Sequence, residues 1–261
     1  MEEKLLTVQD LCVSYGDGDV LSGVTFSMRA GEILCIAGES GCGKSTLLKA
    51  ALGLIVSTGG EVCYDGVPIG QLSRREIAQS AAFLTQSRNT PVISALRMVL
   101  HGRFPYLSYP RRYGREDYAI ARGALARVGA AQHADRNVGE LSGGQRQSVY
   151  LAMALAQQTQ TIFMDEPTTY LDIAHQLALM ETAHALAREG RAVVLVLHDI
   201  PLALRMADRI AVMQDGRVAA CGTPEEIENS RVIDEVFHVA LHAADTPHGR
   251  QYYCVPLQED I

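Results

Sequence analysis

The sequence Gly38-Glu39-Ser40-Gly41-Cys42-Gly43-Lys44-Ser45-Thr46 fits the pattern of a phosphate-binding loop, G-x-x-x-x-G-K-[ST], at every fixed position. Residues 32–37 before it form an apolar run typical of a buried strand, and residues 47–52 after it are rich in good helix formers. Glycines in such a loop let backbone N–H groups converge on a polyphosphate at the positive end of the following helix. The stretch therefore predicts a polyphosphate site in which Lys44 meets the terminal phosphates and Ser45 ligates Mg²⁺.

Length and composition limit the class of protein. The chain has 261 residues, 48% of them apolar and 20% charged, which suits one large domain or a core with an inserted subdomain. A formal net charge of −7 argues against a nucleic-acid partner, because binding to a phosphate backbone usually needs a basic face. The sequence shows neither a signal peptide nor a membrane-spanning run of about eighteen apolar residues, so a cytoplasmic protein is expected. The six cysteines are scattered and indicate neither a zinc site nor disulfides.

Two strands are expected before the phosphate-binding loop, at residues 5–15 and 20–28, joined by a glycine turn at residues 16–19. Tyr15 ends the first of these strands. Its ring could stack on an adenine base, and an ordinary aromatic residue at a strand end is the alternative. Both interpretations stay open on the residues alone.

A second group of elements follows the loop. Residues 59–64 are expected as a short strand, Ser73 opens a capping box before a short helix, and residues 80–85 form a small apolar strand. This strand ends in Gln86, whose amide could reach Mg²⁺ or an attacking water.

Residues 87 to 156 differ in composition from the rest of the chain. Strand signals stop, arginines become frequent, and residues 92–100 and 116–128 have helical spacing. We interpret this segment as a helical insertion in a nucleotide-binding core. Between its two helices lies the aromatic and proline-rich stretch Phe104–Pro110, which indicates either a partner contact or an ordinary solvated loop.

The sequence Leu141-Ser142-Gly143-Gly144-Gln145 opens a further predicted helix. Ser142 and Gln145 have the spacing of a capping box, so a well-capped helix explains them without any ligand. Two consecutive glycines, however, cost helix stability and expose backbone donors at the positive end of the helix dipole. This arrangement suits a second phosphate site.

Two carboxylates stand at the end of the next apolar strand. Residues 161–167 include Asp165 and Glu166, and alternation along a strand sends these two side chains to opposite sides. The two acids can therefore have different roles. Asp165 is expected to hold Mg²⁺ through water, and Glu166 to orient and polarise an attacking water.

Two more candidate residues lie at the ends of elements. A predicted helix over residues 171–187 places Asp172 in its first turn, where the helix dipole favours an acid. The strand at residues 192–197 ends at His198, a candidate sensor of the terminal phosphate because it would lie at the sheet edge where the other loops converge. A core or surface histidine is the alternative for His198.

The rest of the chain gives fold signals only. Residues 210–214 and 218–221 flank an Asp-Gly turn as a hairpin, and Thr223 opens a capping box with proline at the first helical position. Residues 231–261 carry no motif that can be assigned.

The phosphate-binding loop, the Ser-Gly-Gly-Gln helix start, the acidic pair and the strand-end histidine occur in this order, which resembles the ATP-binding subunit of an ABC transporter. The resemblance covers residues 5 to 228. It implies an α/β fold with a RecA-like P-loop NTPase core, an antiparallel β-subdomain and an inserted α-helical subdomain at about residues 87–156. The ABC ATPase domain would cover residues 1–240, followed by a short C-terminal extension at residues 241–261.

The same resemblance assigns roles to residues. It implies a head-to-tail dimer in which the helix start at Ser142 of one copy closes over the γ-phosphate of ATP held by Lys44 of the other. Gln86 would couple the core to the helical subdomain, and Asp172 would lie on a loop at the dimer interface. The implied catalytic residues are Glu166, His198 and Gln86, and the implied Mg²⁺ ligands are Ser45, Gln86 and Asp165. The implied nucleotide contacts are Tyr15, Gly38, Glu39, Ser40, Gly41, Cys42, Gly43, Lys44, Ser45, Thr46, Ser142, Gly143, Gly144, Gln145 and Asp172.

Finer similarity points to one branch of the importers. The chain looks like the ATPases of iron–siderophore importers, a branch that also includes cobalamin and haem systems. The stretches that carry this similarity are residues 102–106, 115–117, 141–147 and 166–176. Ser148 is a departure, because that branch more often has arginine there.

The branch also implies partners and a location. Two permease subunits would dock near Phe104–Pro110, an external substrate-binding protein would act indirectly, and the chain would sit on the cytoplasmic face of the inner membrane. A soluble ABC ATPase without a transport role and an exporter motor are the alternatives. No residue of such a subunit needs to touch the cargo, so the sequence does not identify it.

Overall fold

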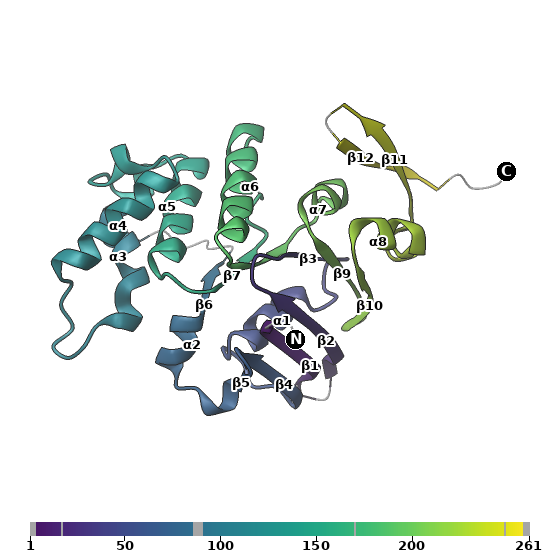
Figure 1. The fold of residues 1–261 in the computed structure, drawn as a ribbon, viewed down its shortest axis with the longest axis horizontal. Coiled ribbons are helices and arrows are strands. Elements are labelled where there is room, and N and C mark those ends of the chain that lie inside the picture. Colours follow the sequence, from purple (N-terminus) through teal and green to yellow (C-terminus); the bar gives the residue numbers. More distant parts are fainter. Residues whose placement is uncertain (1–3, 17, 86–90, 170, 248, 258–261) are drawn as a thin grey trace.

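The computed structural model describes residues 4–16, 18–85, 91–169, 171–247 and 249–257. This part of the chain forms three sheets with helices around them (Figure 1). The first sheet is antiparallel, with the order β2-β1-β4-β5. Its strands are β1 (Lys4–Tyr15), β2 (Gly18–Arg29), β4 (Gly59–Tyr64) and β5 (Val67–Pro68).

The second sheet has six strands in the order β10-β9-β3-β8-β7-β6, and all of them except β10 run parallel. Its strands are β3 (Ile33–Gly38), β6 (Ala81–Leu84), β7 (Thr161–Asp165), β8 (Ala192–Val196), β9 (Arg209–Gln214) and β10 (Arg217–Gly222). β3 lies between β8 and β9, where the order of the strands along the chain changes direction. Loops diverge at such a point and leave a crevice for a ligand. The phosphate-binding loop follows β3 there and leads into α1 (Lys44–Ala51).

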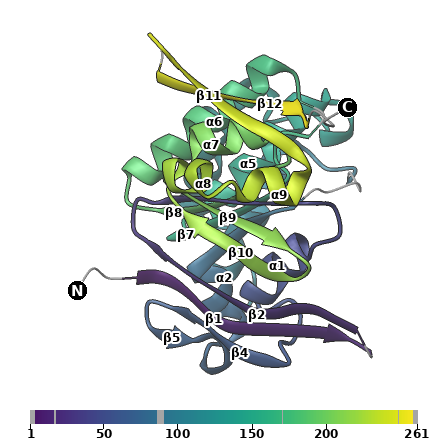
Figure 2. The ribbon, with the colours of Figure 1, turned by 90° about the vertical axis from the view of Figure 1, so that its right-hand side faces the viewer.

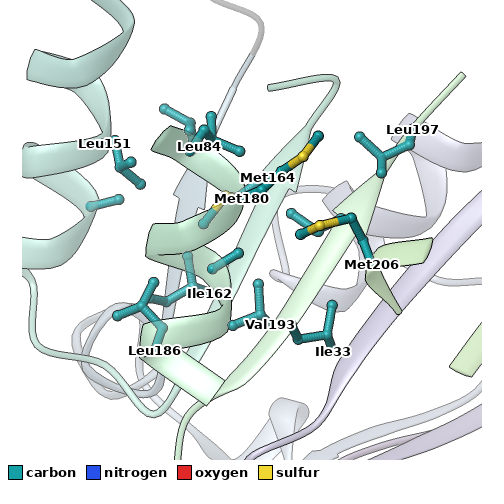
Figure 3. Packing of buried hydrophobic residues seen from close by; sticks show 14 of the residues in the cluster. Ile33, Leu84, Leu151, Ile162, Met164, Met180, Leu186, Val193, Leu197 and Met206 are labelled. Atoms are coloured by element: carbon teal, nitrogen blue, oxygen red, sulfur yellow. The ribbon is translucent and has the colours of Figure 1, made fainter. Parts of the chain in front are cut away.

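The six-stranded sheet is buried on both faces. In β3, Ile33 belongs to one apolar cluster and Leu34 to the other, as alternation along a strand requires. On the first face, Met180 and Leu186 of α6 (Ile173–Arg188) cover the strands (Figure 3). On the second face, Leu47 of α1 packs between this sheet and the antiparallel one. Burial on both sides holds the strand ends that carry the candidate site residues in place.

The predicted helical insertion follows β6 and precedes β7 in the chain, and its helices lie together on one side of the molecule, at the left in Figure 1. Its elements are α3 (Ala95–Leu100), the 3₁₀ helix η2 (His101–Tyr106), α4 (Arg115–Arg127), the 3₁₀ helices η3 (Ala131–His133) and η4 (Val138–Glu140), and α5 (Gly143–Ala156). The buried Arg103, in η2, connects this 3₁₀ helix to α4 and α5. It donates to Asp117 of α4 at 3.1 Å and to the backbone oxygen of Ala156 of α5 at 3.0 Å.

The aromatic stretch of this insertion differs in part from expectation. Phe104 is 47% exposed and Tyr109 is 97% exposed, which agrees with both interpretations of the stretch, a partner contact and an ordinary solvated loop. Tyr106, in contrast, is half-buried, because its hydroxyl donates to the backbone oxygen of Gln157 at 2.7 Å and its ring lies 4.1 Å from the guanidinium of Arg103. The stretch is therefore a 3₁₀ helix with one anchored ring, followed by an exposed loop.

The C-terminal segment without a recognisable motif is folded. It forms α9 (Val232–Phe237) and a two-stranded hairpin, β11 (Val239–Thr246) with β12 (Gly249–Pro256). The hairpin packs on α9 and on α7 (Ile200–Met206), beyond α8 (Pro224–Ser230) (Figure 2). Sequence analysis missed these elements.

The three capping boxes that the sequence predicts are all present at helix starts. α2 (Arg74–Ser80) begins with the predicted capping box of Ser73, after the 3₁₀ helix η1 (Ile69–Gln71), and α5 and α8 begin with those of Ser142 and Thr223. One placement was wrong. Asp172 is not in the first turn of α6 but is its N-cap, because its side chain accepts the N–H of His175. Among the described residues, none of the helices is long and apolar enough to cross a membrane.

Candidate phosphate-binding and hydrolytic site

The phosphate-binding loop leaves no room for side chains at its critical glycine. Gly43 has φ 103°, and a Cβ added there would lie 2.7 Å from Leu21 Cδ2 and 3.0 Å from the backbone oxygen of Val20. Both the left-handed backbone and the packing against β2 therefore require glycine. Glycine at this position therefore lets the loop pack closely against β2.

Lys44 is buried beneath the loop rather than extended into solvent. It is 5% exposed, and its ammonium donates to the backbone oxygens of Gly38 and Glu39, both at 2.7 Å. These carbonyls satisfy the charge in the folded loop. The positive group is thus held inside the loop, where it can meet the terminal phosphates of a nucleotide.

The turn between β9 and β10 supports the loop from outside. The N–H of Gly216 donates to the backbone oxygen of Cys42 at 3.2 Å, and the carbonyl of Gly216 accepts the N–H of Ser22 at 2.9 Å. Gly216 therefore links the loop to β2. Sequence analysis recognised the Asp-Gly turn but did not predict this supporting contact.

Tyr15 ends β1 opposite Gly18 of β2, and 56% of its surface is exposed. An exposed ring at a strand end can stack on a flat base without prior rearrangement. Its adenine contact stays a prediction.

Asp165 stands at the end of β7, and its environment fits a hard cation. Its Oδ1 is buried and has no hydrogen-bond partner among the described residues. Burial raises the pKa of Asp165, while a hydrogen bond from Ser45 and the charges of Lys49 and Lys44 oppose that shift and Glu166 adds to it. An unsatisfied carboxylate oxygen beside a serine hydroxyl is an oxygen-donor set that suits Mg²⁺.

Glu166 and His198 meet at the same sheet edge. Glu166 follows β7 with φ 48°, a conformation uncommon for residues other than glycine. Its Oε1 lies 2.5 Å from Nε2 of His198, which follows β8. Because an ionised carboxylate only accepts, the ring donates from Nε2. The predicted base and the predicted phosphate sensor are therefore in direct contact.

The helix start at Ser142 lies elsewhere. Ser142 Oγ accepts the N–H of Gln145 at 3.3 Å, and the Gln145 side chain accepts the N–H of Ser142 at 3.2 Å. Among the described residues, no hydrogen bond joins residues 142–145 to the phosphate-binding loop. Gly144 of this segment lies against His175 of α6 instead, and Gln147, further along α5, donates to the backbone oxygen of Pro167 in the loop after β7 at 3.2 Å. One chain thus presents two separate candidate phosphate sites.

The structure brings together many of the predicted residues. The phosphate-binding loop, Asp165, Glu166 and His198 lie at the carboxyl ends of β3, β7 and β8. Asp172 lies at the end of the loop that begins with Glu166. The predicted catalytic and metal-binding Gln86 lies outside the described residues.

Comparisons with known proteins give a consistent result. A family pattern described as "ABC transporter" matches residues 21–169. The petrobactin import ATP-binding protein FpuD of Bacillus anthracis is 36% identical over 97% of this chain and 94% of its own length. The ferric enterobactin transport ATP-binding protein FepC of Escherichia coli is 36% identical, with 95% and 93% covered, and the hemin import ATP-binding protein HmuV of Streptomyces coelicolor is 38% identical, with 97% and 90% covered.

Solved structures agree. A chain from an inward-facing ABC transporter described as metal-chelate type superposes with a TM-score of 0.85 and 28% identity, covering 98% of both chains. A nucleotide-free ATP-binding cassette from an ABC transporter, 24% identical, has a TM-score of 0.81 over 90% of this chain and 97% of its own, which shows the shared fold.

Proposed function

Since this chain belongs to the ABC transporter family, as its ATP-binding and ATP-hydrolysing type of subunit, we propose that it drives import of an iron(III)–siderophore-type complex. The observation that supports hydrolysis best is the contact of Glu166 with His198 at the sheet edge that also carries Lys44. The cargo class is supported by relatives named for import of petrobactin, ferric enterobactin and iron(3+)-hydroxamate, each matching at least 95% of this chain.

In the proposed mechanism, the phosphate-binding loop and Lys44 hold the ATP phosphates, and Tyr15 stacks on the adenine. Ser45 and Asp165 would hold Mg²⁺, together with Gln86, and the ion would neutralise charge on the phosphates. Glu166 accepts the hydrogen bond of an attacking water and orients it towards the γ-phosphate. When the site closes, the Nε2–H of His198 would turn from Glu166 to the terminal phosphate, which leaves Glu166 free to accept from the water.

We propose that two copies hydrolyse ATP together. In a head-to-tail pair, residues 142–145 of one copy would face the γ-phosphate held by the other, and Asp172 would lie at the interface. Two features support this arrangement: the capped start of α5 exposes backbone donors, and it has no hydrogen bond to the loop of its own chain in the described structure. The core and insertion boundaries proposed for this unit are residues 1–240 and about 87–156.

The proposed partners are permease subunits of a membrane transporter, aided by an external substrate-binding protein. The exposed rings of Phe104 and Tyr109 offer a dock near residues 104–110, and Arg111 lies 4.6 Å over the Phe104 ring. Such a chain would sit on the cytoplasmic face of the membrane by docking alone.

A haem importer is the second candidate, because the Streptomyces coelicolor and Rhodococcus jostii relatives named for hemin import are 38% and 39% identical. Uptake assays separate the two cargoes. A strain lacking this chain should fail to take up one labelled ferric siderophore while haem uptake continues, and the reverse result would favour haem. Recovery of the tagged chain without any polytopic membrane protein would instead favour a soluble ABC ATPase.

A further inference from the structure

We propose that His175 is a positioning residue that ties the described part of the loop after β7, residues 166–169 and 171–172, to the helix start at residues 142–145 of the same chain. The inference rests on the proposed dimer, in which these two segments serve different nucleotides. Through this link, a change at the nucleotide bound by one chain would shift residues 142–145 of that chain, which face the nucleotide bound by the partner copy.

The first half of the link joins His175 to Asp172. Both the backbone N–H and the ring Nδ1 of His175 lie within hydrogen-bond distance of Asp172 Oδ1, at 2.9 and 2.8 Å. A carboxylate only accepts, so Nδ1 carries the proton and the ring direction is fixed. The two hydrogen bonds lower the pKa of Asp172, which keeps that acceptor ionised.

The second half joins the ring of His175 to the start of α5. A Cβ added to Gly144 would lie 2.5 Å from ring Cδ2 and 2.6 Å from both Cγ and Nε2, closer than atoms can approach. The ring therefore lies directly against the backbone of Gly144, with no space between them. A side chain at this position would have to push the ring away, so glycine at position 144 is what leaves room for the ring in its place beside Asp172.

A second connection reinforces the first. Gln147, one turn into α5, donates to the backbone oxygen of Pro167 at 3.2 Å. From α6, Gln176 donates to the backbone oxygens of Thr168 and Leu171 at 3.4 and 3.2 Å. The loop after Glu166 is thus attached to α5 and α6 together.

The attachment has a functional consequence. When Glu166 and the loop after it adjust to the nucleotide of their own chain, the start of α5 moves with them. In the proposed dimer that helix start faces the nucleotide of the partner copy. His175 acts on hydrolysis through this placement and touches neither nucleotide.

The test compares His175→Ala, His175→Asn and the control His184→Ala, which changes a histidine further along the same helix. Asparagine can still donate to Asp172 but cannot fill the space beside Gly144. We expect His175→Ala to lower kcat/KM for ATP roughly tenfold, the loss of one hydrogen bond to a charged group, and His175→Asn to recover part of it. The affinity of the phosphate-binding loop for a fluorescent ADP analogue should stay within about twofold, since that loop is not touched. His184→Ala should behave as the unchanged protein.

Two outcomes would overturn the proposal. One is unchanged kcat and KM in His175→Ala; the other is a loss of ADP-analogue affinity as large as the loss of kcat/KM, which would indicate general damage to the fold. Glu166→Gln, measured alongside, tests the proposed function separately. If Glu166→Gln keeps its turnover while His175→Ala loses it, the base assignment fails and the positioning role stands.

Discussion

Replacing Glu166 by glutamine tests the hydrolytic site most directly. The change removes the negative charge and keeps the shape, and the remaining amide oxygen can still accept the bond from His198 Nε2, which now spans 2.5 Å. Any fall in turnover would therefore come from the loss of the general base, because the packing of the side chain is kept. General bases contribute about 10² to 10⁴ in rate, so turnover should fall by that factor, which raises the barrier by about 3 to 5 kcal/mol.

The same variant should keep its nucleotide. Glu166 follows β7, whereas the loop around Lys44 follows β3 and keeps its own hydrogen bonds. Phosphate release at saturating Mg-ATP measures turnover, titration with a fluorescent nucleotide measures affinity, and size-exclusion chromatography with ATP detects a trapped dimer. Glu181→Gln, on the exposed side of α6, is the matched control. Turnover above about a tenth of the unchanged protein would refute the role given to Glu166.

Three further predictions follow from other contacts. Lys44→Ala should weaken nucleotide binding about tenfold or more in the same titration, because a charge-assisted contact to phosphate is lost. The double change of Phe104 and Tyr109 to alanine should reduce recovery of the tagged chain with membranes, while nucleotide affinity stays unchanged. Arg127 lowers the pKa of Glu189 through a bidentate pair at 2.6 and 2.9 Å, so this stabilisation is present above the unfolded pKa of glutamate and fades as the pH falls through the lower folded value. Urea unfolding of Arg127→Gln should show a loss of at most about 1 kcal/mol at pH 7, because the pair is exposed, and a smaller loss near pH 3.

Local signals predict those parts of the fold that local physics controls. The capping boxes of Ser73, Ser142 and Thr223 form as expected because each is complete within four residues. The strand at residues 59–64 matches β4 at both ends. The phosphate-binding loop is predictable for the same reason, since its glycines, lysine and flanking elements are contiguous in sequence.

The elements that were missed depend on distant contacts. β11 has only one buried residue, Leu241, so it shows no alternation that would indicate a strand. It is fixed by its pairing with β12 and by packing on α9. Tyr106 looked exposed for a similar reason, because its partners Arg103 and Gln157 are recognisable only once α5 packs against the 3₁₀ helix.

The residues of the candidate site also include some that the sequence predicts and some that it does not. Sequence order gives the residues that end strands, such as Asp165 and His198, because parallel strands bring their carboxyl ends to one edge. It does not give Gly216 or His175, whose roles come from the backbone of Cys42 and of Gly144 that they touch. A signal for His175 existed in part: the residue three positions after the N-cap Asp172 donates its backbone N–H to that carboxylate, and a histidine there can also donate from its ring.

The separation of the two candidate phosphate sites explains why a glycine pair is used at the start of α5. A helix that needed only a cap would be served by Ser142 and Gln145, and alanine at position 144 would strengthen it. The structure places His175 where that alanine methyl would be, and the ring is held there by an acid of the loop after Glu166. Glycine at this position therefore lowers the stability of α5 but allows the start of this helix to contact His175, which is bound to the loop after Glu166. A fixed relative position of the two segments would matter in the proposed pair of copies that share two nucleotides, and this contact gives glycine at position 144 a purpose besides the exposure of backbone donors.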